Sequence, residues 1–196
     1  MIMETQNIDN KILYKPEAVV HTYANQLQYD DTDKKSPQFT SQDTTDYKRE
    51  VLQVSAFDVA AYILQKIGCC STMKLHKLLY YCQAWSLVWD EHALFNEKIE
   101  AWANGPVVHS VFTYHKGLFS VNSNDFLIGN PNMLSTFQKE TVDNVLAYYG
   151  NKSAQWLINL THMEKPWKEA RVGLEPMERG NKEITHSAMA EYYSSL

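Results

Sequence analysis

Apolar residues follow a helical spacing along much of this chain, and the pattern is most continuous from Thr72 to Trp89. At about 100° per residue, one face of such a helix collects a row of apolar side chains. These are Leu75, Leu78, Leu79, Cys82, Trp85 and Trp89. The opposite face is also partly apolar and leaves a narrow polar stripe that holds His76, Lys77 and Gln83. A helix that is apolar around most of its circumference is typical of a domain interior. We therefore expect this helix to be the buried centre of the fold.

Capping signals predict where this helix and the one before it begin. Ser55 is followed three residues later by Asp58, which fits a capping box and predicts a helix that ends at Gly68. Ser71 or Thr72 can cap the central helix, because either hydroxyl can accept a free backbone N–H.

The segment after the central helix combines extended and turn signals. Ile99–Trp102 alternates in polarity and predicts a short strand. Asn104, Gly105 and Pro106 predict a turn, and Pro106 is a suitable first residue for a helix that ends near Gly117. The following loop, residues 119–131, could hold a hairpin.

Amphipathic segments predict further helices in the C-terminal half. One spans Leu134–Tyr149, a second is capped by Ser153 and broken before Pro166, and a last one is capped by Thr185. A short helical turn over residues 167–171 lies between them. The predicted fold class is mainly α: a compact single-domain helical fold of six or seven helices around a buried central helix, with one or two short strands.

The predicted domain organisation is an N-terminal extension, residues 1–50, followed by a helical domain over residues 51–196. Pro16 is placed to open a helix in the extension. Residues 30–48 are rich in Asp, Thr, Ser and Gln, and such a segment buries too little apolar surface to fold alone. The extension is therefore either poorly ordered or a segment that docks on a partner or on its own domain.

Composition narrows the classes of function. The net charge is -5, from 18 basic and 23 acidic residues, which argues against nucleic acid as the main partner. No long apolar run, signal peptide or lipidation motif occurs, so we expect no membrane association and a cytoplasmic location. The 3 cysteines lack C-x-x-C spacing and are expected to be buried or partly buried thiols.

No residue pattern points to catalysis, a cofactor or a metal ion. The 7 histidines fit neither H-E-x-x-H nor a Cys/His cluster. The chain also has no P-loop and no G-x-S-x-G. Asp58, Glu100 and Glu164 could form carboxylate pairs, but the sequence does not fix their separation. We predict no catalytic, cofactor-binding or metal-binding residues and keep an unrecognised small enzyme as an alternative.

Aromatic and turn residues are the candidates for a partner-binding surface. Exposed Trp and Tyr side chains are effective interface anchors, although each can equally serve the core or a tight turn. The candidates on the central helix qualify only if their face is uncovered. The full set is Tyr80, Tyr81, Leu87, Glu100, Trp102, Asn104, Gly105 and Pro106.

One ion pair is predicted inside the domain. Arg171 is expected to pair there with Glu100 or Glu164.

Eight short stretches, taken in order, resemble one bacterial and phage family. They are Ser55–Leu64 (SAFDVAAYIL), Met73–Trp85 (MKLHKLLYYCQAW), Leu94–Phe95, Ile99–Trp102, Gly105–Val108, His115–Gly117, His162–Trp167 (HMEKPW) and Ala170–Arg171. The family is the SocA-like or Panacea antitoxin domain family, also labelled phage-associated proteins, and the resemblance covers about residues 54–196. The sequence departs from the family pattern at His76, where Gln is commoner, and in a shorter region after Phe119.

The resemblance implies an antitoxin of a toxin–antitoxin system. Members pair with unrelated toxins, many of which inhibit translation, and act by direct protein–protein contact. We expect the partner to be a cognate toxin encoded next to this chain. The founding member is an adaptor for its toxin, so delivery of the toxin to a Clp-type protease is the alternative. A DNA-binding regulator is a further alternative, weakened because the extension lacks a helix-turn-helix pattern.

Overall fold

A computed structural model of the chain describes residues 53–196. The predicted extension, with its helix from Pro16 and its linker, lies outside the described residues. Within them the helices are α2 (Ala56–Ile67), α3 (Thr72–Trp89), α4 (His109–His115), α5 (Thr136–Tyr149), α6 (Ala154–Met163), α7 (Lys165–Ala170) and α8 (His186–Tyr193). Two short 3-10 helices are η1 (Ser123–Phe126) and η2 (Pro131–Met133). The strands form two antiparallel pairs, β1 (Cys70–Ser71) with β4 (Ser120–Val121) and β2 (Ile99–Trp102) with β3 (Gly105–Val108). The predicted mainly α fold class is confirmed.

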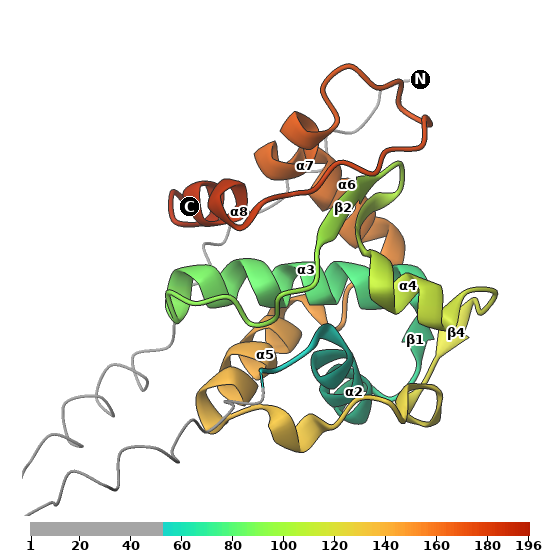
Figure 1. Cartoon of the computed structure of the whole chain (residues 1–196), viewed down its shortest axis with the longest axis vertical. Helices are drawn as coiled ribbons and strands as arrows, with labels where there is room; N and C mark the ends of the chain where they lie inside the picture. The colour runs from blue at the N-terminus through green and yellow to red at the C-terminus, as the bar shows by residue number, and fades with distance from the viewer. Residues whose placement is uncertain (1–52) are drawn as a thin grey trace, which may run out of the picture. The chain divides into compact units, whose positions relative to one another are not determined.

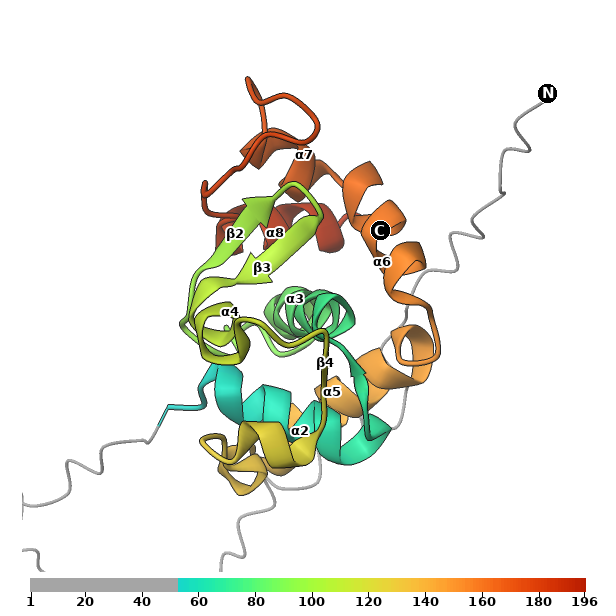
Figure 2. The ribbon, with the colours of Figure 1, turned by 90° about the vertical axis from the view of Figure 1, so that its right-hand side faces the viewer.

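Helix α3 lies at the centre of this domain and the other elements surround it. Figures 1 and 2 show α2 and α5 on one side of α3, with α6, α8 and the β2–β3 hairpin on the other. Every residue from Leu75 to Ser86 is buried. The narrow polar stripe of α3 is therefore inside the domain as well, which the apolar pattern alone does not require.

The predicted capping signals form in the structure. The Ser55 hydroxyl accepts the Asp58 N–H, and the Asp58 carboxylate accepts the Ser55 N–H at 2.9 Å, which completes the capping box. Gly68 ends α2 with a φ of 76°, a conformation that favours glycine. Of the two candidate caps for α3, it is Ser71 that accepts a helix N–H, from Lys74.

The prediction that Pro106 opens a helix is wrong. Pro106 lies within β3, and α4 begins only at His109. Pro106 is paired with Ala101, whose N–H donates to the Lys182 carbonyl at 2.9 Å and whose carbonyl accepts the Arg171 guanidinium at 3.0 Å. Because both backbone groups of Ala101 point away from β3, the missing N–H of proline removes no hydrogen bond from the hairpin.

Residues 119–131 also do not form the predicted hairpin. Val121 of β4 pairs with Cys70 of β1, a residue that precedes the central helix. The Thr72 N–H extends this contact by donating to the Phe119 carbonyl at 3.0 Å. This pairing brings residues 117–121 beside the start of α3, where they help to form the site described next.

Candidate functional site

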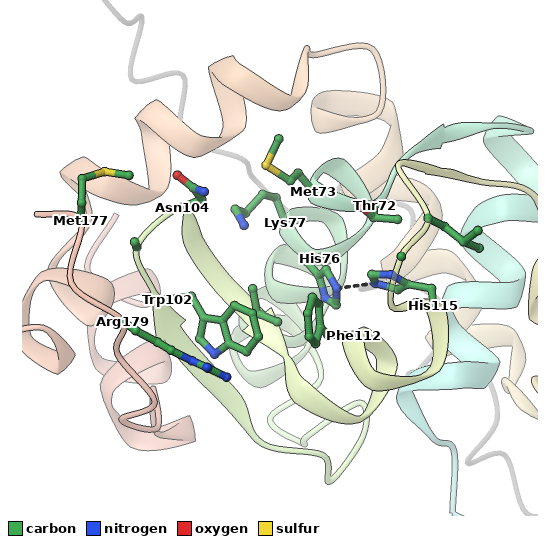
Figure 3. Close-up of a pocket in the computed structure, with 14 residues that line it drawn as sticks. Thr72, Met73, His76, Lys77, Trp102, Asn104, Phe112, His115, Met177 and Arg179 are labelled. Atoms are coloured by element: carbon green, nitrogen blue, oxygen red, sulfur yellow. Dashed lines mark hydrogen bonds between the residues drawn. The ribbon is translucent and has the colours of Figure 1, made fainter.

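A pocket of about 440 Å³ opens beside the first two turns of α3. Its walls come from α3, the β2–β3 hairpin, α4 and the segment after it, and the loop that follows α7, as Figure 3 shows. The side chains and backbone that line it are Thr72, Met73, His76, Lys77, Trp102, Ala103, Asn104, Val107, Phe112, His115, Gly117, Leu118, Met177 and Arg179. No acidic residue is among them, so all ionisable side chains of the lining are basic.

The Lys77 side chain is the most unusual part of this lining. It is only 1% exposed, and its ammonium donates to the Pro106 carbonyl at 3.0 Å. Burial lowers the pKa of Lys77 from 10.5 to about 7, because a charged ammonium loses its hydration inside the domain. Gly105 makes room for it: a Cβ there would come within 2.5 Å of the Lys77 Cε and 2.8 Å of the Thr161 hydroxyl.

A histidine pair forms the wall of the pocket next to α4. The Val108 N–H donates to His76 Nδ1 at 3.3 Å, so a neutral His76 carries its proton on Nε2. That nitrogen lies 2.8 Å from His115 Nε2 and donates to it, which leaves the His115 proton on Nδ1 (Figure 3). Burial, followed by the positive charge of Lys77, holds the His76 pKa well below 6.5. The pair is therefore neutral near pH 7 and serves as a hydrogen-bonding wall.

Aromatic rings continue the lining next to this pair, where the Phe112 ring lies 5.7 Å from that of His115. The Trp102 ring meets the Phe112 ring at 4.6 Å in an edge-on arrangement, and its indole N–H donates to Glu100 at 2.7 Å. The guanidinium of Arg179 lies 5.7 Å from the Trp102 ring centre, within cation–π range. The carbonyl of Trp102 also accepts the indole N–H of Trp167 at 3.0 Å, which ties the hairpin to α7.

The prediction that Arg171 pairs with Glu100 or Glu164 is wrong. Arg171 is buried and donates to four backbone carbonyls, those of Ala101, Glu175, Pro176 and Glu178. These bonds attach the loop after α7 to β2. The same loop carries Met177 and Arg179, so Arg171 positions one side of the pocket without lining it.

Glu164 belongs to a separate buried cluster between α3, α7 and α8, and it does not line the pocket. Its carboxylate accepts the hydroxyl of Tyr193 at 2.8 Å and that of Tyr81 at 3.3 Å. Burial raises the Glu164 pKa to about 8, although the two tyrosine hydrogen bonds act in the opposite direction. At neutral pH this side chain is mostly an uncharged carboxylic acid that links α3, α8 and the start of α7.

The predicted partner-binding residues divide into two groups. Tyr80 and Tyr81 are fully buried, so the condition that their face of α3 be uncovered is not met, and Leu87 is half-buried near the end of the helix. The hairpin group instead lies together at the pocket: Trp102 and Asn104 line it, Gly105 and Pro106 hold Lys77, and Glu100 holds the Trp102 indole.

Sequence reasoning missed Lys77, His76, His115 and Arg179 as members of this site. One signal was available, because His76 and Lys77 form the polar stripe of a helix that was expected to be buried almost all round. A polar stripe of this kind has to find partners inside the domain or line a cavity. No comparable signal exists for Arg179, which reaches the pocket through loop geometry alone.

Within residues 53–196, no group of three or more His, Cys, Asp and Glu side chains could hold a metal ion. In the same part of the chain, no helix is long and apolar enough to cross a membrane.

Comparison with known proteins gives a match to a protein family. Residues 75–168 match the family model described as antitoxin SocA-like, Panacea domain, and this segment contains α3, the β2–β3 hairpin, α4 and Glu164. No curated protein and no solved structure matches the chain. The match supports the resemblance noted from the sequence, and residues 75–168 are similar to the antitoxin SocA-like Panacea domain.

Proposed function

We propose that this chain neutralises a cognate toxin by binding it directly, through the surface that surrounds the pocket beside α3. The Panacea domain supports an antitoxin-like role and a protein partner in general. The proposed partner is a translation-inhibiting toxin encoded next to this chain, and the proposed place of action is the cytoplasm.

The observation that carries this proposal is the apolar rim of the pocket. Met73, Leu118 and Met177 line the pocket and are 45%, 47% and 77% exposed, and the neighbouring Phe119 is 92% exposed. Large apolar side chains gathered around a pocket at the surface are typical of protein interaction sites. Methionines suit this role because their flexible side chains adapt to the shape of a partner. The aromatic ring of Trp102 supplies a central anchor of the kind that dominates binding energy.

Growth rescue and capture of the complex test the proposal together. The neighbouring open reading frame is induced with and without this chain, and the pair is then purified through a tag on the antitoxin. We expect rescue, a stable complex and an undiminished amount of toxin. Leu118→Lys and Met177→Lys should each weaken rescue and capture, because they place charge on the apolar rim.

Leu127→Lys is the matched control, since Leu127 is 80% exposed but does not line the pocket. It should rescue as well as the unchanged chain. A harmless neighbour, or rescue without a complex, would overturn direct neutralisation. If rescue depends on a Clp-type protease and the toxin has a shorter half-life in the presence of this chain, the adaptor mechanism replaces it.

A further inference from the structure

The charge around the pocket is opposite in sign to the charge of the chain. The whole chain carries -5, yet the charged side chains that line the pocket are Lys77 and Arg179, beside a neutral histidine pair. The carboxylate of Glu100 accepts the Trp102 indole N–H and does not line the pocket. The first turn of α3, which supplies Thr72 to the lining, also lacks an acidic residue that would offset the positive end of the helix dipole. The local field in this pocket therefore attracts anions.

Lys77 has hydrogen-bonding capacity that the described residues do not use. An ammonium group has three N–H donors, and the bond to the Pro106 carbonyl uses one of them. No carboxylate in residues 53–196 forms an ion pair with it, although the side chain is almost completely buried. Figure 3 shows the side chain running from α3 toward Asn104 at the turn of the hairpin. A buried ammonium without a counter-charge is costly, which is why burial lowers the Lys77 pKa to about 7, and an anion bound beside it would favour the charged form.

The shape of the pocket indicates what should carry the anion. Trp102 and Phe112 offer an apolar wall that suits a short hydrocarbon stem, while Asn104 at the mouth is exposed and offers an amide. The apolar rim lies on the same surface and suits a protein more than a free small molecule. A Glu or Asp side chain that projects from a protein surface combines these properties.

We propose that the pocket binds a carboxylate supplied by an acidic side chain of the protein partner, with Lys77 as its main ligand. The inference rests on the proposed function, because the partner is taken to be the toxin. Lys77 would donate its free N–H groups to the carboxylate, and Arg179 and Asn104 would hold the mouth of the pocket around it. Charge-assisted hydrogen bonds of this kind are among the strongest in protein interfaces.

Lys77→Met tests this assignment because methionine keeps most of the side-chain volume and removes the charge. The dissociation constant of the toxin complex is measured with the full chain, together with the thermal unfolding temperature of the free chain. We expect binding about 10- to 100-fold weaker. We also expect unchanged or higher thermal stability, because a buried unpaired charge has been removed.

Lys74→Met is the matched control. Lys74 lies one turn earlier on α3 and also donates to a backbone carbonyl, that of Gly150 at 2.6 Å, but it does not line the pocket. It should leave the affinity for the toxin unchanged. A purely structural role for Lys77 predicts the reverse result for Lys77→Met, with lower stability and the same affinity, and that result would overturn the inference.

A double-mutant cycle then locates the partner's carboxylate. Each Asp and Glu of the toxin is changed to its amide, and binding to the unchanged chain and to Lys77→Met is compared. One toxin variant should bind the unchanged chain more weakly than the unchanged toxin does. The same variant should bind Lys77→Met with nearly the same affinity as the unchanged toxin. If no variant shows this coupling, the inference fails while direct neutralisation stands.

A probe of the free chain separates a small acid from a protein side chain. N-acetylglutamate is titrated into the chain and the indole N–H signal of Trp102 is followed by NMR. If this acid shifts the signal in a Lys77-dependent way while toxin affinity does not depend on Lys77, the pocket serves a free small acid and the partner assignment is overturned. If the neighbouring protein neither harms growth nor binds, the proposed function itself has failed.

Discussion

Glu164→Gln should change how the stability of this protein depends on pH. Glu164 is buried against Tyr81 and Tyr193, and burial raises its pKa from 4.5 to about 8. The unfolded chain releases this proton near pH 4.5, whereas the folded chain keeps it until about pH 8. Between these values the folded state binds more protons, so this group makes the protein less stable as the pH rises. Glutamine cannot ionise and removes this loss.

The expected size of the effect follows from the two pKa values. They differ by roughly 3.5 pH units, and each unit corresponds to about 1.4 kcal/mol, so the upper limit is about 5 kcal/mol. Most of this loss falls between pH 5 and pH 8. We expect the free energy of unfolding of Glu164→Gln to rise by about 3 kcal/mol relative to the unchanged chain over that interval. This is a large part of the 5–15 kcal/mol that is typical of a domain.

Urea unfolding followed by tryptophan fluorescence at pH 5, 6, 7 and 8 measures this difference. Subtracting the two curves cancels the other buried groups. Among these are His76 and Lys77, whose pKa values are lowered. Their effect on stability is opposite to that of Glu164, because they make the protein more stable as the pH rises. Glu169→Gln, an exposed carboxylate on α7, is the control and should give a nearly constant difference. A Glu164→Gln difference that does not change with pH would refute the reasoning.

Two further predictions concern packing and thiol chemistry. Gly105→Ala should lower the free energy of unfolding by about 2–3 kcal/mol, because the new Cβ meets two side chains below 3 Å at a φ of 95°. Gly117→Ala, with a φ of 97° but open space around it, should cost only about 1 kcal/mol, and equal thermal shifts for the two variants would contradict this account. In the native chain Cys69 should react rapidly with a thiol reagent. Cys70 and Cys82 should react slowly, because they are buried and burial raises the Cys70 pKa to about 11 and the Cys82 pKa further. Rapid modification of more than one thiol would contradict the burial.

The local patterns of the sequence were sufficient for most helices. The capping box at Ser55, the end of α2 at Gly68 and the length of α3 are set by residues within a few positions of one another. Helical periodicity also predicted that α3 is the buried centre, because apolar side chains on nearly every face leave it no stable position at the surface.

The hairpin residues were recognised for a reason that was only partly correct. Trp102 and Asn104 do line the pocket, but Pro106 lies in a strand and not at the start of a helix. Whether Pro106 lies in a strand or a helix depended on the segment around Lys182, which pairs with β2. Because of this pairing, Pro106 needs no N–H to bond to β2. A contact between residues so far apart in the chain has no local signal.

The sequence by itself thus determined most helices, the central position of α3 and the resemblance to the antitoxin SocA-like family. Only the tertiary structure decided which polar groups meet. Arg171 binds backbone carbonyls instead of a carboxylate, and Lys77 and Arg179 come together at one pocket although they lie at distant positions in the chain. The physical reason is that helix formation and capping depend on neighbouring residues. Burial, hydrogen-bond partners and the field in a pocket depend on every element packed around them.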